Sequence, residues 1–168
     1  VAAGLTVDAG AVYAIGRLSL CVVPASGIDP ALPPAERIAA LPGMPPGHVA
    51  LANPELAPYG RAARQALATT GHWERLQPHL VLGENVAQAA QFLTSGAATA
   101  AFVPDAMAAE PALAPFACSI LPEDWHAPLR QRMVLVRGAG EGAADFYRFV
   151  LGPEGRAIIA RHGYQLPP

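Results

Sequence analysis

The fold is decided by residues 49–60, VALANPELAPYG, and by residues 80–86, LVLGENV. In each stretch, an apolar run typical of a buried strand leads within a few residues into the start of a helix. Pro58 suits the first position of a helix, and Asn85 is a good N-cap. Because open α/β sheets place such junctions at the carboxyl ends of their strands, both helix starts are predicted to lie at one edge of a sheet.

The rest of the chain alternates predicted strands with predicted helices. Strands are expected at 12–23, 48–52, 79–82, 98–103, 116–121 and 133–136, and helices at 35–41, 59–70, 73–76, 86–94, 142–151 and 153–162. This alternation predicts an α/β protein with a mostly parallel sheet flanked by helices. The last predicted strand is followed by two consecutive helices, so the chain is expected to leave the sheet there.

Composition limits the function. The chain is 52% hydrophobic and only 14% charged, so it can bury a sizeable core. Its net charge is −2 and its basic residues are scattered, which makes nucleic acid a poor partner. No apolar run reaches the roughly 18 residues of a membrane span. An anion site in such a chain must use backbone N–H groups rather than clustered positive charge.

The two helix starts offer such groups. The first N–H groups of a helix have no acceptor within the helix, and the helix dipole favours negative charge there. Tyr59 and Val86 carry the candidate donors, supported by Pro58, by Gly60, whose backbone can approach a ligand closely, and by Asn85, which caps its helix and leaves the Val86 N–H pointing outward. Either junction alone is ordinary in α/β proteins. Together they predict one wall of a site for a small oxyanion.

Several short sequence words, taken in order, resemble the molybdate-binding periplasmic proteins of ABC importers. They are YAIGRL at 13–18, NPELAPYGRAA at 53–63, GENVAQ at 83–88, SGA at 95–97, LPED at 121–124, FYRF at 146–149, GPEGRAII at 152–159 and HGYQLP at 162–167. These words extend over nearly the whole chain.

The resemblance implies a lobe of the type II periplasmic-binding-protein fold. Residues 20–130 correspond to the second, ligand-binding lobe. Residues 1–19 correspond to a remnant of the first lobe with the first crossover, and residues 131–168 to the return crossover and the C-terminal helices of the first lobe. Nothing here matches the rest of the first lobe, so this chain is expected to supply half of the site. Its terminal helices either fold back or form a homodimer with another copy.

The resemblance also implies a function without catalysis, cofactor or bound metal. The ligand is molybdate or tungstate, held by the backbone N–H groups of Tyr59 and Val86, and the partner is an ABC transporter permease at the membrane. Some family members add a tyrosine hydroxyl where this chain has Val103-Pro104, so Tyr59 contributes either its hydroxyl or only its backbone. The expected location is the periplasm, with no signal peptide in this chain. The alternative is the oxyanion-sensing domain of a transcription regulator, which upstream sequence would distinguish.

Other candidates are less specific. The five histidines lack metal-ligand spacing, and no serine lies in a nucleophile motif. Glu123-Asp124 fits a solvated loop after a strand, and the two tryptophans fit packing positions. Arg130 and Arg132 fit solvated charges, with an inter-lobe or transporter contact as the alternative. Cys21 and Cys118 are interpreted first as buried thiols, and a disulfide remains the alternative.

Overall fold

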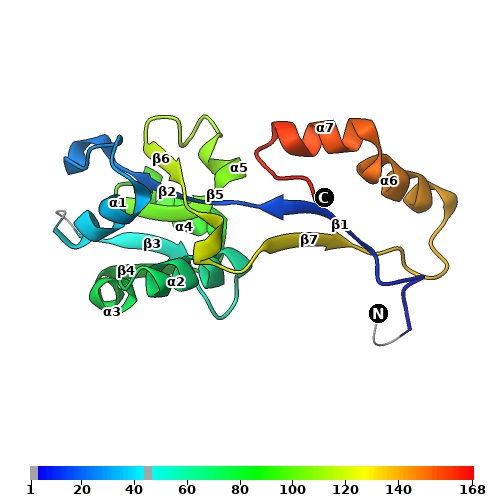
Figure 1. Cartoon of the computed structure of the whole chain (residues 1–168), viewed down its shortest axis with the longest axis horizontal. Helices are drawn as coiled ribbons and strands as arrows, with labels where there is room; N and C mark the ends of the chain where they lie inside the picture. The colour runs from blue at the N-terminus through cyan, green and yellow to red at the C-terminus, as the bar shows by residue number, and fades with distance from the viewer. Residues whose placement is uncertain (1–3, 44–46) are drawn as a thin grey trace. The chain divides into compact units, whose positions relative to one another are not determined.

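The computed structural model describes residues 4–43 and 47–168, and it divides the chain into two compact units (Figure 1). The central unit is Arg17–Leu129. The terminal unit combines Val1–Gly16 with Arg130–Pro168. Among the described residues, no helix has both the length and the apolar character to cross a membrane.

The central unit is built on a five-stranded sheet with the order β4-β3-β5-β2-β6. Its strands are β2 (Leu18–Val22), β3 (Val49–Ala52), β4 (Leu80–Gly83), β5 (Ala100–Pro104) and β6 (Ala117–Ile120). Strand β3 pairs in parallel with β4 and β5, whereas β2 pairs antiparallel with β5 and β6. Four strands therefore run in one direction and β2 runs against them. The sheet is mixed, with the predicted parallel part at β4-β3-β5.

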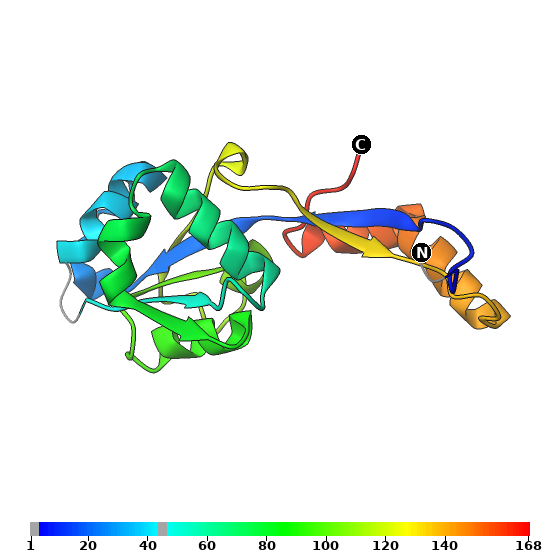
Figure 2. The same cartoon turned by 90° about the horizontal axis from the view of Figure 1, so that it is seen from below.

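Helices cover both faces of this sheet (Figure 2). They are α1 (Pro34–Ala40), α2 (Pro58–Thr69), α3 (Trp73–Leu76), α4 (Val86–Thr94) and α5 (Asp105–Ala108), with 3-10 turns at Pro24–Ser26, Leu41–Gly43, Gln77–His79 and Glu123–Trp125. Because side chains alternate along a strand, Val49 and Leu51 pack in one core with α2, whereas Ala50 packs in a second core with α4. Helices α2 and α4 thus lie on opposite faces of the sheet.

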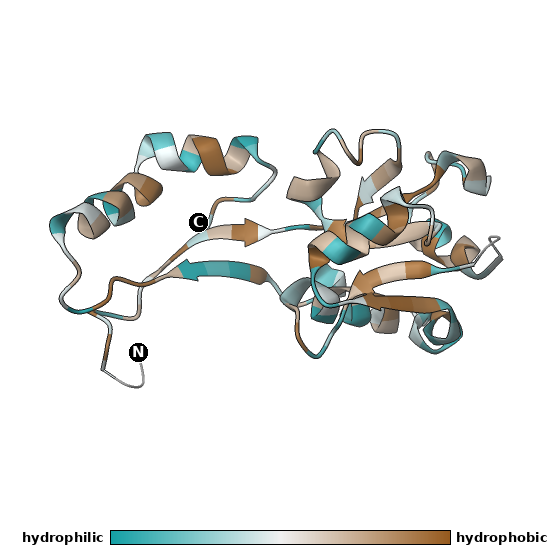
Figure 3. Ribbon diagram, turned by 180° about the vertical axis from the view of Figure 1, so that it is seen from behind, coloured by the Kyte–Doolittle hydropathy of each residue, from teal (hydrophilic) through white to brown (hydrophobic). Residues whose placement is uncertain are grey.

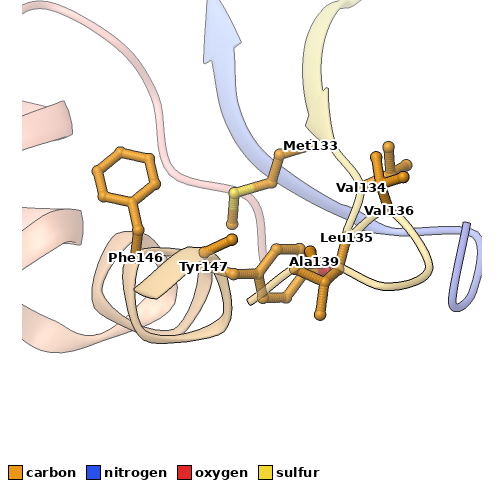
Figure 4. Close-up of a pocket in the computed structure, with 8 residues that line it drawn as sticks. Met133, Val134, Leu135, Val136, Ala139, Phe146 and Tyr147 are labelled. Carbon is orange, nitrogen blue, oxygen red and sulfur yellow. The ribbon is translucent and has the colours of Figure 1, made fainter. Parts of the chain in front are cut away.

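The terminal unit has a two-stranded sheet of β1 (Ala11–Gly16) and β7 (Leu129–Met133), followed by α6 (Glu141–Leu151) and α7 (Pro153–Arg161). Figure 3 shows hydrophobic residues on both helices. The large apolar side chains that this unit exposes are Leu5, Val7, Val134, Val136, Phe146, Phe149 and Ile158. Figure 4 shows part of this apolar face, a pocket of about 280 Å³ to which Met133, Phe146 and Tyr147 contribute.

Two predicted strands are wrong in their bounds. The strand expected at 12–23 is two strands of different sheets, β1 and β2, which are separated at Arg17. The strand expected at 133–136 lies earlier, at Leu129–Met133. Its sequence, LRQRM, is mostly polar because alternate side chains are exposed, so hydrophobicity placed the strand too late.

The favoured interpretation of the cysteines as thiols is also wrong. Cys21 and Cys118 form a disulfide between neighbouring strands. The two residues lie directly opposite each other in the β2–β6 pair, with their Cα atoms 3.9 Å apart. The disulfide therefore fastens the edge strand β6 to its neighbour β2.

Candidate oxyanion-binding site

The two predicted strand–helix junctions are neighbours in space. Strands β3 and β4 pair in parallel with Ala52 opposite Gly83, which are the last residues of the two strands. The Asn53 N–H then donates to the Gly83 carbonyl oxygen at 2.7 Å, so the pairing continues one residue into the first junction. Helix α2 begins at Pro58 and α4 at Val86. The sheet thus brings both helix N-termini to its carboxyl edge, from opposite faces.

The start of α4 has a completed cap. Asn85 is the N-cap, and its side-chain oxygen accepts a hydrogen bond from the Gln88 N–H at 3.0 Å. The Gln88 side chain in turn accepts from the N–H of Glu84, the residue before the N-cap, at 2.7 Å. The Val86 N–H has no acceptor among the residues that the structure describes. The side chains of Asn85 and Gln88 therefore accept from the Gln88 and Glu84 N–H groups, and neither accepts from the Val86 N–H.

The start of α2 has no side-chain cap. Its N-cap is Ala57, and Pro58, which has no N–H, takes the first helical position. The Arg61 N–H donates to the Ala57 carbonyl oxygen at 3.0 Å, so the N–H groups of Tyr59 and Gly60 lie in the first turn ahead of that bond. The half-buried Tyr59 ring packs against the core on the α2 face of the sheet. Its backbone is therefore fixed at the sheet edge.

Gly60 has a packing role at the start of α2. A Cβ atom at this position would lie 2.0 Å from the Ala52 carbonyl oxygen, so glycine is required where α2 crosses the end of β3. Gly83 has the corresponding role in the second junction, because its Cβ would lie 2.9 Å from the Ala89 backbone nitrogen. These contacts show that the two glycines allow the helices to approach the sheet. The predicted approach of a ligand to the Gly60 backbone stays a prediction.

A cluster that sequence reasoning missed lies at the same sheet edge. Asp105 follows β5, and its carboxylate accepts from Arg17 Nη2 at 2.6 Å and from the Ser19 hydroxyl at 2.9 Å. The Asp105 N–H also donates to the Arg17 carbonyl oxygen at 2.9 Å. Ser19 is fully buried. The arrangement neutralises a carboxylate near the candidate site and holds the first residue of the central unit against the sheet.

The remaining observations concern metal-binding side chains and one buried arginine. In the described part of the chain, no three His, Cys, Asp or Glu side chains gather where they could hold a metal ion. Burial lowers the pKa of Arg37, because desolvation penalises its charged form. Its guanidinium donates to the Ala117 carbonyl oxygen, so it ties α1 to β6.

An α/β lobe with a mixed sheet, and with helix N-termini at the carboxyl edge of that sheet, is the architecture of a periplasmic-type binding protein. The chain belongs to the family of bacterial extracellular solute-binding proteins, whose family model matches residues 1–165. This assignment confirms the predicted fold class.

Curated relatives carry the name molybdate-binding protein ModA. The one from Rhodobacter capsulatus is 37% identical over 119 residues, which are 70% of this chain and 46% of that protein. The one from Azotobacter vinelandii is 32% identical over 157 residues, which are 92% of this chain and 60% of that protein. The chain thus spans about half the length of these relatives.

Solved structures agree with this family. The periplasmic molybdate-binding protein of Azotobacter vinelandii superposes with a TM-score of 0.81 at 30% identity, over 99% of this chain and 72% of that chain. The substrate-binding domain of a molybdenum ABC transporter protein from Clostridium difficile, described as putative, has a TM-score of 0.75 at 18% identity. The latter similarity shows the shared fold.

Proposed function

We propose that the protein is the solute-binding component of an importer for molybdate or tungstate. The observation that carries the proposal is the adjacency of the α2 and α4 N-termini at the register pair of Ala52 and Gly83. Curated relatives of this chain are named molybdate-binding proteins. The proposed donors are the backbone N–H groups of Tyr59 and Val86.

The chemistry of the junctions suits a tetrahedral dianion. Two helices begin at the same edge of the sheet, where the positive ends of their dipoles and their first-turn backbone donors can bind an oxyanion without a lysine or arginine cluster. All tetrahedral dianions of this kind satisfy the same donors, so the size of the cavity decides between molybdate, tungstate and sulfate. The proposed role is binding without catalysis.

The remaining parts of the proposal concern partners. We propose that these residues hold one wall of the site and that a further lobe supplies the opposite wall, so that the two lobes close on the ligand. The closed form is then recognised, in the periplasm, by a permease that lies in the cytoplasmic membrane.

Where the further lobe is absent, the exposed apolar face of the terminal unit is proposed to pair with the same face of a second copy of this chain. Sedimentation equilibrium tests that pairing, and a monomer at all concentrations contradicts it.

Calorimetric titration tests the function. Molybdate, tungstate and sulfate are titrated into this chain and into a version that carries a complete first lobe. We expect tight binding of molybdate and tungstate by the two-lobed version, and weak or undetectable binding by this chain alone. If the two-lobed version ignores both oxyanions, the proposed function is wrong.

A conservative variant distinguishes the two roles of Tyr59. Tyr59→Phe keeps the backbone N–H and removes the hydroxyl. We expect the affinity of the two-lobed version for molybdate to stay within about twofold, because the donor is the backbone, whereas loss of a hydroxyl hydrogen bond costs about 1 kcal/mol or more, about fivefold in affinity. A drop of that size assigns the contact to the hydroxyl and contradicts the backbone assignment.

A further inference from the structure

Asn53 connects the two strand–helix junctions of the candidate site. Its N–H donates to the carbonyl oxygen of Gly83, the last residue of β4, at 2.7 Å. Its carbonyl oxygen accepts from the N–H of Ala57, the N-cap of α2, at 2.9 Å. One residue is therefore bonded both to the strand that leads into α4 and to the residue that begins α2.

Asn53 also organises the segment between β3 and α2. Its side-chain oxygen accepts from the Glu55 N–H at 3.0 Å, and its carbonyl oxygen accepts from the Leu56 N–H at 3.1 Å. These are the hydrogen bonds of an Asx turn and of a β-turn, in which Pro54 fixes φ at the second position. The turn therefore restricts the path by which the chain reaches Ala57.

The first turn of α2 packs against Asn53. A Cβ atom at Gly60 would lie 2.9 Å from the Asn53 carbonyl carbon, so no side chain fits between the two backbones. Tyr59, which carries one of the proposed donors, lies between Ala57 and Gly60. Because Asn53 is bonded to Ala57 and packs against Gly60, a displacement of the turn is expected to displace the Tyr59 N–H as well.

Asp29 forms a turn of the same kind without these links. Its side-chain oxygen accepts from the Ala31 N–H at 2.8 Å, its carbonyl oxygen accepts from the Leu32 N–H at 3.2 Å, and Pro30 follows it. The chain reaches this turn from the end of β2, which runs against the other strands, so β2 ends at the opposite edge of the sheet. Within the described part of the chain, no backbone hydrogen bond of Asp29 reaches a strand or a helix.

We propose that Asn53 is the positioning residue of the oxyanion site, because its turn sets the distance between the Tyr59 and Val86 N–H groups. The inference rests on the proposed function for the identity of the ligand. Donors that bind one small ion together must be held within about 0.5 Å of the productive geometry. Neither donor belongs to Asn53, so its substitution leaves both N–H groups present and changes only their relative position.

Asn53→Ala tests the inference, and Asp29→Ala is its matched control. Each variant removes one exposed hydrogen bond from a backbone N–H to a side-chain oxygen, so we expect equal shifts of the urea unfolding midpoint. Molybdate is then titrated calorimetrically into the two-lobed version at about 0.15 M salt, which screens the charge lost from Asp29. We expect about threefold to fivefold weaker binding for Asn53→Ala and unchanged binding for Asp29→Ala.

A rescue variant separates positioning from a general loss of stability. The Asn53→Ser hydroxyl can accept the Glu55 hydrogen bond more weakly, so this variant is expected to recover part of the affinity. Equal molybdate affinities of Asn53→Ala and Asp29→Ala overturn the inference. So does an affinity loss in both variants that follows their loss of stability.

Amide chemical shifts of this chain test the same inference without a ligand. We expect Asn53→Ala to move the amide signals of Tyr59 and Glu84, one in each junction, and Asp29→Ala to move neither. Changes confined to residues 53–56 contradict the positioning role. If the unsubstituted two-lobed version does not bind molybdate but Asn53→Ala moves both signals, the proposed function fails and the positioning of the two helix starts by Asn53 stands.

Discussion

The central and terminal units differ in how far they bury their own apolar surface. In the central unit, Phe102, Leu20 and Leu51 are at most 1% exposed, and helices cover the sheet on both faces. In the terminal unit, Phe146 is 65% and Val136 54% exposed. A closed core is the property of a unit that folds by itself, whereas an open apolar face needs a cover. The candidate oxyanion site therefore lies in the unit that has a closed core.

Removal of the disulfide is expected to have the largest effect, and to act on the central unit. Cys21 and Cys118 are 97 residues apart, so the loss of this crosslink lowers the free energy of unfolding by about 4.7 kcal/mol in the chain-entropy account. Urea unfolding, with and without reductant, measures it through Trp73 and Trp125, which both lie in the central unit. An unchanged midpoint after reduction contradicts the prediction. The reductant is expected to have no effect on a variant with alanine at both positions.

The same substitution in the two units sharpens the comparison. Phe102→Ala empties space in a closed core and is expected to cost about 3–4 kcal/mol. Phe146→Ala removes an exposed ring and is expected to change the free energy of unfolding by about 0.5 kcal/mol or less. Urea unfolding followed by far-ultraviolet circular dichroism measures both. Equal losses would show that the terminal unit has a closed core of its own.

The stability of the central unit is expected to depend on Asp105. Asp105→Ala removes the acceptor of both Arg17 and Ser19 and is expected to cost about 2 kcal/mol, because the pair is mostly buried. The exposed pair of Arg64 and Glu55, at 3.2 Å, provides the control. Glu55→Ala is expected to cost less than about 0.5 kcal/mol. The two variants are compared by urea unfolding, and equal costs contradict the assigned role of Asp105.

The smallest expected effect concerns the cap of α4. Asn85→Ala removes the acceptor of the Gln88 N–H and is expected to cost about 1 kcal/mol. Asn85→Ser keeps a side-chain oxygen at the cap and is expected to stay close to the original stability. Thermal unfolding monitored by circular dichroism distinguishes the two variants. If both variants lower the stability equally, the side-chain oxygen at position 85 does not stabilise the protein.

Local sequence signals predicted the helix starts of the candidate site. Pro58 and Asn85 mark the beginnings of α2 and α4 because their signals depend on the residues immediately around them. The adjacency of the two junctions followed from the general rule for parallel strands, and the register of Ala52 and Gly83 confirms it. The roles of Tyr59 and Val86 as ligand donors remain predictions.

Long-range partners could not be predicted from the same signals. Arg17 and Asp105 are 88 residues apart, and the sequence around each residue does not indicate that they pair. The pairing of Cys21 with Cys118 depends on the register of β2 and β6 in the same way. A glycine at a helix start is consistent both with ligand approach and with packing, and the sequence alone does not show the packing partner. The structure shows that partner, the Ala52 carbonyl oxygen.

The central claim is that the helix N-terminus at Val86 donates to an oxyanion, and Val86→Pro tests it most directly. Proline suits the first position of a helix, as Pro58 does in α2, so the variant keeps α4 and removes only the N–H. Val86→Ala, which keeps the N–H, is the control. Calorimetric titration of molybdate into the two-lobed version is predicted to show at least about a tenfold loss of affinity for Val86→Pro and little change for Val86→Ala. Equal affinities in the two variants would contradict the account.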